Sequence, residues 1–529
     1  MAHETKARPT PLQSCICTLL LTSLSLLLSP ITMFVTVTCY IASFLANSHL
    51  GPGRDLRVRR RTILVTGARA NKALILIRAF KREGHRVIAA DEEKWGKYAM
   101  SRFSRGVDSY WLLPDPHVDE RHYIDVMKTI VAKEGVDAWV PCSSVQATMI
   151  DSEAAKEIRE GRLGGLQGCD CFIPEPSIAG TLHWKDNFEG ILKELSIPVP
   201  DSKVVTSVKD AVDFLYSPQT ANKGHKYLLK CLTLDDLGRD NFTLFPLDTR
   251  EETLKHLSDI PTPITQKDPF LLQQFLRGPE YCTHVAARDG RIVAFVACRS
   301  NQLLMRYADV TNLGEEESAM GAQMKHWSQR FLDLYKAKLE GEGKTGPEYA
   351  LTGHFSFDFI YEQTLYALEC NVRPHTAIVL FSSFPNLASH YLGHVSGIAQ
   401  PSPGTVPRSW LTHALPLTIA RTLIPPSWCR YIHPQLHSTL YPPPPSSFQR
   451  VKSTNEDPTA SPPPSVGPVS LLKSYLINAT DKDGVWDWTD PVPFFVLCHV
   501  TWPWLLWNRM RRGVAWSRVN VSTARVFEC

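Results

Sequence analysis

The sequence FDFI at positions 357–360 is followed by ECNVR at positions 369–373, and these two segments decide the fold. Both read as strands, and we expect them to pair antiparallel. Side chains alternate along a strand, so Asp358 and Glu369 would project from one face, with Asn371 two residues further on the same face. Two carboxylates and an amide oxygen form an all-oxygen donor set, which suits Mg²⁺, or Mn²⁺ in its place. The pair of strands therefore predicts a cation site.

Three basic residues are candidates for binding phosphate beside that cation. Arg373 follows Asn371 at the same alternating spacing and would offset the charge of a transferring phosphoryl group. Lys185 and Lys230 would supply point charges from the opposite wall. A lysine taken alone is more often a surface residue. The prediction therefore depends on the order of these residues along the chain.

Upstream, the pattern alternates between strand and helix. A β-rich run at 62–66, a helical pattern at 71–83 and a second strand-like run at 86–90 form a βαβ unit. The turn at 67–70, with Asp91 after the second strand, is the place of a dinucleotide site, but the GxGxxG fingerprint is absent. We expect a Rossmann-like domain that serves as a scaffold.

From about Cys171 the chain reads as a second α/β unit with a long helix near its end. Its strands are expected at Lys226–Lys230, Pro269–Phe275, Tyr281–Ala287, Arg291–Ala297, His354–Tyr361 and Leu365–Cys370, and its helix at Lys325–Leu339. The fold class is thus α/β followed by α+β.

The N-terminal region predicts membrane attachment. No Asp, Glu, Lys or Arg lies between Arg8 and Arg54, and the segment 15–45 is nearly all apolar, longer than the roughly 20 residues that a spanning helix needs. Ser29-Pro30 divides it, so a single span and a hairpin in one leaflet both remain open. A cleaved signal peptide is disfavoured by the length. The basic cluster at 54–61 predicts that the rest of the chain faces the cytosol.

Composition excludes several classes. The 57 basic and 53 acidic residues give a net charge of +4, which offers no stripe for nucleic acid. Hydrophobic residues at 43% and charged residues at 21% are ordinary globular values. Thirteen cysteines without a CxxC pair indicate free thiols, and HExxH, GxSxG and P-loop motifs are missing.

The C-terminal part is unusual in composition. Sixteen of the 39 prolines lie between Pro401 and Pro468, which predicts a linker. The apolar, Trp-rich run 493–507 is too short to span comfortably, so it is either a buried helix, which we favour, or an interfacial anchor.

The order of these residues, with QQFLRGPE at 273–280 between the lysines and the acids, resembles the ATP-grasp superfamily, in which two α+β subdomains clamp ATP after a Rossmann-like preATP-grasp domain. The resemblance covers roughly residues 61–384. It implies that ATP is bound by Lys185, Lys230, Gln273, Gln274, Leu276 and Glu280, with Glu280 accepting from the ribose hydroxyls. The family often has an acid at the place of Gln273, and a glycine-rich loop after Lys230, where this chain offers Arg239 as a candidate replacement.

Within that superfamily the chain is similar to the mycosporine-glycine synthase type of ligase, through Cys282-Thr283-His284, His375 and the block 490–494. The resemblance implies that ATP phosphorylates the ring oxygen of 4-deoxygadusol and that an amino acid displaces phosphate. Arg373, Lys230, His284 and His375 are its candidate catalytic residues. Both histidines also fit a structural role, whereas a catalytic one would bind substrate or remove a proton from the amine. Cys282 and Cys370 fit small buried side chains.

The expected layout is a membrane segment, a preATP-grasp domain, an ATP-grasp domain, a linker and a Trp-rich block. Their ranges are 1–53, 54–170, 171–400, 401–468 and 469–529. Two alternatives remain: a carboxylate–amine ligase acting through an acyl phosphate, and a catalytically silent ATP-grasp scaffold. The expected partners are small-molecule substrates and a membrane, with no nucleic acid, and the oligomeric state stays open.

Overall fold

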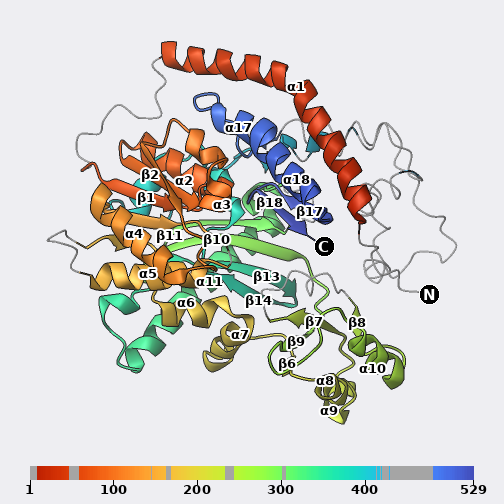
Figure 1. Ribbon diagram of the computed structural model, residues 1–529. Helices are drawn as coiled ribbons and strands as arrows, with labels where there is room; N and C mark the ends of the chain where they lie inside the picture. Colours follow the sequence, from red (N-terminus) through yellow and green to blue (C-terminus); the bar gives the residue numbers. More distant parts are fainter. Residues whose placement is uncertain are drawn as a thin grey trace.

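The computed structural model describes residues 9–46, 59–144, 146–161, 168–232, 243–300, 306–412 and 481–528, together with 414–416, 419 and 428. In this part of the chain, a parallel sheet and a larger antiparallel sheet form one body, a small antiparallel lobe extends from it, and a long helix lies across the C-terminal helices (Figure 1).

The first sheet is parallel throughout, with the strand order β3-β2-β1-β4-β5. Its strands are β1 (Thr62–Thr66), β2 (Arg86–Glu92), β3 (Ser109–Leu113), β4 (Ala138–Pro141) and β5 (Asp170–Cys171). The associated helices are α2 (Asn71–Arg82), α3 (Glu93–Gly96), η1 (Met100–Phe103), α4 (Glu120–Glu134) and α5 (Thr148–Glu160). The predicted βαβ unit is confirmed, because its two strands and intervening helix form where the sequence pattern placed them.

The small lobe is a four-stranded antiparallel sheet in the order β6-β9-β7-β8. Its strands are β6 (Ser202–Val205), β7 (Tyr227–Cys231), β8 (Leu244–Phe245) and β9 (Phe270–Gln274), and its helices are α8 (Val208–Leu215), α9 (Pro218–Ala221) and α10 (Arg250–Ser258). A separate apolar cluster stabilises it, with Tyr227, Phe245 and Leu272 fully buried. The lobe therefore has a core of its own.

The larger sheet has the strand order β11-β10-β13-β14, and the short β12 pairs with β10. Its strands are β10 (Glu280–Arg288), β11 (Arg291–Arg299), β12 (Gly353–His354), β13 (Ser356–Glu362) and β14 (Thr364–Asn371). The neighbouring helices are α6 (Pro176–His183), α7 (Lys185–Glu194), η3 (Val310–Asn312), α11 (Glu315–Gly341), η4 (Pro347–Tyr349), η5 (Thr376–Phe381) and α12 (Leu387–Tyr391). One face packs on α6, α7 and α11 through a second apolar cluster.

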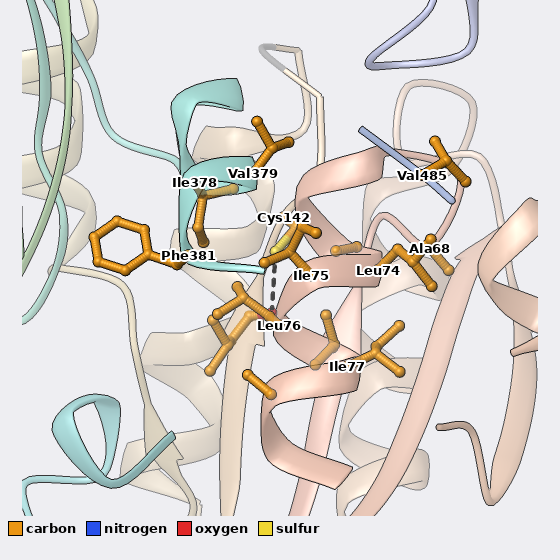
Figure 2. Packing of buried hydrophobic residues seen from close by; sticks show 14 of the residues in the cluster. Ala68, Leu74, Ile75, Leu76, Ile77, Cys142, Ile378, Val379, Phe381 and Val485 are labelled. Atoms are coloured by element: carbon orange, nitrogen blue, oxygen red, sulfur yellow. Dashed lines mark hydrogen bonds between the residues drawn. The ribbon is translucent and has the colours of Figure 1, made fainter. Parts of the chain in front are cut away.

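Helix α2 joins the sheets into one core. Leu74 to Ile77 are at most 2% exposed, so this stretch of the helix is buried on all sides. In Figure 2, Ile378 to Phe381 of η5 pack against one side of α2, and Val485 of the C-terminal block packs against another. Three distant parts of the sequence thus share one cluster.

The C-terminal block begins with β16 (Lys482–Asp483), which pairs in parallel with β15 (Arg408–Ser409). It continues through α17 (Val492–Val496), the π-helical turn η7 (Leu497–Thr501), α18 (Trp502–Arg511), β17 (Trp516–Asn520) and β18 (Arg525–Glu528). The Trp-rich run is largely a buried helical segment, as favoured from the sequence: Leu497, Leu505 and Leu506 are at most 3% exposed, whereas Trp507 at its end is 46% exposed. The linker prediction is wrong at its beginning, because β15 is paired and the adjacent Trp410 is 1% exposed.

The N-terminal segment forms one helix, α1 (Pro11–Leu45), which continues through Pro30. Proline removes a backbone donor and bends a helix without reversing it, and α1 bends midway (Figure 1). The hairpin alternative is therefore wrong for this segment, because no turn interrupts it.

Candidate active site

The predicted acidic pair forms on β13 and β14. Asp358 and Glu369 are direct partners in the antiparallel register, and a bulge follows Asp358. The Asn371 side-chain amide donates to Asp358 Oδ2 at 3.2 Å and to Glu369 Oε1 at 3.3 Å. The expectation that all three side chains share one face is confirmed.

The carboxylates of Asp358 and Glu369 repel each other, and this repulsion affects their pKa values. Burial, followed by the neighbouring charge of Glu369, raises the pKa of Asp358 above its ordinary value. The ammonium of Lys185 holds the pKa of Glu369 below its ordinary value, because its Nζ lies 3.0 Å from Glu369 Oε2. The neighbouring cations Lys185 and Arg373 oppose this repulsion, but the pKa of Asp358 stays raised, and a metal ion bound between the two half-buried carboxylates would offset the repulsion that remains.

The oxygen atoms of Asp358, Glu369 and Asn371 are the type of ligand that Mg²⁺ prefers. In the part of the chain that the structure describes, no group of three or more His, Cys, Asp or Glu side chains is placed to hold a metal. Asp358, Glu369 and Asn371 would instead contribute two carboxylates and an amide oxygen, leaving other positions for waters and phosphate oxygens. Rotation of the Asn371 amide would turn its oxygen toward the ion.

Two predicted cations border this pair. Lys185 is the first residue of α7, which packs against β14 and so brings the ammonium to Glu369. Arg373 follows β14, and its guanidinium donates to the Asn371 side-chain oxygen. Both are therefore placed at the acidic pair, as the sequence order predicted.

Lys230 approaches from the small lobe. Its Nζ donates to Gln273 Oε1 at 2.5 Å, across from β7 to β9. Burial, followed by the charge of Lys185, lowers the pKa of Lys230 to about 8, against the opposing effects of Glu369 and Glu280. Lys185 and Lys230 are thus near enough for the charge of one to lower the pKa of the other, and they lie on either side of one site.

The other predicted nucleotide contacts divide between two faces. Gln273 is buried beside Lys230, whereas Gln274 points to the opposite face of β9 and accepts from the Asp201 backbone N–H at 3.1 Å. Its side chain is therefore turned away from Lys230, and its contact with a nucleotide stays a prediction. Leu276 is buried, and Glu280 is exposed at the start of β10. Arg239 lies outside the described residues.

The two candidate histidines differ in environment. His284 is 0% exposed; its Nε2 is 2.9 Å from the Tyr391 hydroxyl, and its Nδ1 accepts from the His375 backbone N–H at 3.2 Å. Burial lowers the pKa of His284 to about 3. Both ring nitrogens are occupied within the core, which gives His284 a structural role and does not support the catalytic hypothesis.

His375 caps η5 through its Nδ1, which accepts from the Ala377 backbone N–H at 3.1 Å. It is partly exposed at the end of the segment that carries Arg373. Cys282 and Cys370 are buried free thiols, as expected. His375 thus remains a candidate for contact with substrate.

One residue of the site escaped the sequence analysis. Lys72 of α2 is 6% exposed, and its Nζ donates to the Pro374 carbonyl oxygen at 3.1 Å. Burial, followed by the charge of Arg373, lowers the pKa of Lys72 to about 7. Lys72 thus connects the parallel-sheet domain to the turn after Arg373 by a hydrogen bond. In the sequence, its position in the first turn of α2 was the only indication of this role.

The dinucleotide position is filled by the chain itself. The Asn71 backbone N–H at the start of α2 donates to the Ser522 carbonyl oxygen at 2.8 Å. A helix N-terminus binds phosphate through such N–H groups, and this one is used by the turn between β17 and β18. The scaffold interpretation of the Rossmann-like part agrees with this contact.

No family model and no curated protein matches the chain. Among solved structures it is similar to the biotin carboxylase domain of 2-oxoglutarate carboxylase from Hydrogenobacter thermophilus in complex with MgADP, ADP and bicarbonate, at 16% identity and a TM-score of 0.42, over 60% of this chain and 65% of that one. The L-amino acid ligase from Bacillus licheniformis matches at 14% identity and a TM-score of 0.38, over 60% of this chain and 68% of that one.

A third similar structure is N5-carboxyaminoimidazole ribonucleotide synthetase from Thermus thermophilus, at 16% identity and a TM-score of 0.43, over 64% of this chain and 80% of that one. The chain spans about 65% of the length of the first structure.

Proposed function

We propose that the chain is an ATP-grasp ligase that uses Mg-ATP to form a carbon–nitrogen bond, and that it joins 4-deoxygadusol to an amino acid. One observation carries the ligase assignment: the β13–β14 pair sets Asp358, Glu369 and Asn371 together, with Lys185 bonded to Glu369. The substrate assignment rests on the sequence resemblance to the mycosporine-glycine synthase type.

The chemistry needs charge stabilisation more than a protein nucleophile. The acceptor oxygen attacks the γ-phosphorus of ATP and ADP leaves. The amine then attacks the carbon that bears the phosphorylated oxygen, the C–O bond breaks to release phosphate, and the nitrogen loses a proton. Bound Mg²⁺ would supply positive charge to the phosphates at Asp358, Glu369 and Asn371. Lys185 and Lys230 would hold the phosphate chain, and Arg373 would face the group in transfer.

The position of Lys72 supports an anionic acceptor. Its ammonium lies buried beside Arg373, at the boundary between the parallel-sheet domain and the large sheet. Two neighbouring cations in a buried place are stabilised by an anion between or beside them. An enolate oxygen and a carboxylate are both anions that could lie there. The test therefore has to distinguish the proposed activity from that of a carboxylate–amine ligase.

The test is ADP and phosphate release by the purified full-length protein in mild detergent. Mg-ATP is supplied with 4-deoxygadusol and a panel of amino acids, or with carboxylate and amine pairs. We expect release that requires both ring and amino acid, together with a product that absorbs in the near ultraviolet. Release with carboxylate and amine pairs alone would replace the substrate assignment, and no release with any pair would contradict the ligase assignment.

A further inference from the structure

Helix α1 is attached to the folded body along its whole length. Near its start, Ser14 Oγ accepts from the Trp516 backbone N–H at 3.0 Å, and the Trp516 indole donates to Thr18 Oγ1 at 3.1 Å. Near its end, Arg105 donates to Ser43 Oγ at 2.8 Å and lies over the Tyr40 ring at 5.3 Å. Figure 1 shows α1 crossing α17 and α18 between these points.

The middle of the helix is held by one imidazole. The Ser25 hydroxyl is 2.9 Å from His499 Nδ1, and the Thr32 hydroxyl is 2.6 Å from His499 Nε2. Ser25 also donates to the Cys498 carbonyl oxygen at 3.0 Å. The contact therefore continues on both sides of Pro30.

These attachments follow a periodic stripe of small polar residues. The stripe consists of Ser14, Thr18, Ser25, Thr32, Thr36 and Ser43. Their spacings of four and seven keep them on one side of a helix. Ser14, Thr18 and Ser43 are at most 2% exposed, so the small polar side is the side that faces protein.

The opposite side is apolar and uncovered in the described part of the chain. Leu26, Leu27, Phe34 and Leu45 are 74%, 73%, 73% and 77% exposed. The side also carries Leu12, Leu19, Leu20, Ile31, Met33, Val37, Ile41 and Phe44. An apolar surface of this extent marks a contact with another apolar phase.

The attached length argues against a membrane span. From Ser14 to Ser43 the helix rises about 44 Å at about 1.5 Å per residue, whereas the hydrocarbon core of a bilayer is about 30 Å thick. Every part long enough to cross would have to leave the body and lose its hydrogen bonds to Trp516, His499 or Arg105. The attached helix can instead lie parallel to the bilayer surface.

The charges around the helix identify the occupant. No Asp, Glu, Lys or Arg lies between Arg8 and Arg54, and basic residues flank this segment in the sequence on both sides. Arg511 and Arg512 are exposed at the end of α18, which packs against α1; Arg512 is paired with Glu528 at 3.2 Å, and Trp507 of α18 is 46% exposed. An apolar helix face with basic residues before and after it in the sequence, and with exposed Arg and Trp on the helix it packs against, complements an anionic headgroup layer.

We propose that α1 is an in-plane anchor, with its apolar face in one leaflet of an anionic bilayer and its Ser/Thr stripe on the protein. The first test is flotation of the full-length chain with vesicles of neutral phosphatidylcholine and with vesicles that also contain phosphatidylserine. We expect binding to the anionic vesicles that falls at least tenfold in Leu26→Glu/Phe34→Glu. Leu254→Glu, on the exposed face of α10, is the matched control and should bind normally.

The second test distinguishes an in-plane helix from a span. Ser25 and Cys498 line one cavity of about 120 Å³ between α1 and the C-terminal block, so Ser25→Cys should form a disulfide with Cys498 when mild oxidant is added. We expect the same cross-linked yield with and without vesicles, and an N-terminal tag that stays accessible to protease outside the vesicles. The proposal would be overturned if Leu26→Glu/Phe34→Glu bound vesicles as well as the wild type, or if vesicles protected the N-terminal tag from protease. It would also be overturned if the wild type did not bind vesicles and instead formed a dimer that the double variant disrupted.

Discussion

Replacing Glu369 with glutamine tests the acidic pair most sharply, because the change removes one charge and almost no volume. In the wild-type protein Glu369 lies 3.0 Å from the Lys185 ammonium and directly opposite Asp358. The variant would leave Lys185 without that partner and relieve Asp358 of a neighbouring negative charge. The pKa of Asp358, which burial and Glu369 raise, should then move back toward its ordinary value.

The distance between Glu369 and Lys185 sets an upper bound on the electrostatic energy that the substitution removes from this ion pair. Two unit charges 3.0 Å apart interact by about 5 kcal/mol at an effective dielectric constant of about 20. That figure is an upper bound, since both side chains are about 30% exposed and solvent screens them. The expected loss of activity comes instead from the missing metal ligand: losing about 3 to 5 kcal/mol of charge stabilisation in the transition state lowers the rate by about 10² to 10⁴-fold. Stability should change by no more than about 1 kcal/mol, because the gain at Asp358 offsets the loss at Lys185.

The assay is substrate-dependent ADP release as a function of magnesium concentration, with thermal unfolding in parallel. Glu340→Gln is the matched control, because Glu340 is exposed on α11 outside the site and undergoes the same chemical change. A Glu369→Gln enzyme with activity within threefold of wild type, at the same magnesium requirement, would refute the metal assignment.

Four further changes have defined outcomes. Lys230 loses its charge as pH rises through about 8, so kcat/KM for ATP should fall above that pH, and Lys230→Arg should remove this decline from the pH profile; an unchanged profile would contradict the phosphate role. Asp490→Asn leaves the buried Arg78 guanidinium unpaired and should cost about 3 to 5 kcal/mol in urea unfolding, and a loss below 1 kcal/mol would refute the account of this contact. His284→Gln should cost about 1 to 3 kcal/mol of stability while kcat stays within about threefold, whereas a hundredfold loss of kcat in a folded variant would restore the catalytic hypothesis. Gly278→Ala would place a Cβ 1.6 Å from a backbone carbonyl oxygen at the end of β13, so it should destabilise by more than about 2 kcal/mol in thermal unfolding, and a neutral result would show that this backbone yields.

The sequence predicts the local parts of the site well. Strand alternation placed Glu369 and Asn371 on one face, and the expected antiparallel pairing of the two strands added Asp358 to that face. The order of Lys185 and Lys230 ahead of the acids was informative because it resembled a known arrangement of motifs. The same alternation turns the side chain of Gln274 away from that of Gln273, which the resemblance to the motif did not indicate.

Long-range packing could not be predicted in the same way. Arg78 and Asp490 are separated by 412 positions, and neither lies in a pattern that indicates a partner. The small polar stripe of α1 is present in the sequence, but the apolar composition of the segment predicted only membrane attachment. The contacts of the stripe with the C-terminal block depend on the three-dimensional structure. Trp410 was assigned to the linker for a similar reason, because proline content describes a segment on average and not each residue.

The most direct measurement of the central claim is calorimetric titration of the full-length protein with Mg-ADP, since it needs no knowledge of the acceptor. The account predicts a single site in the wild type and in Glu340→Gln. It also predicts that Asp358→Asn/Glu369→Gln weakens magnesium-dependent binding by at least about 100-fold, equivalent to about 2.7 kcal/mol. Equal affinity in the double variant, or no binding of Mg-ADP to the folded wild-type protein, would contradict it.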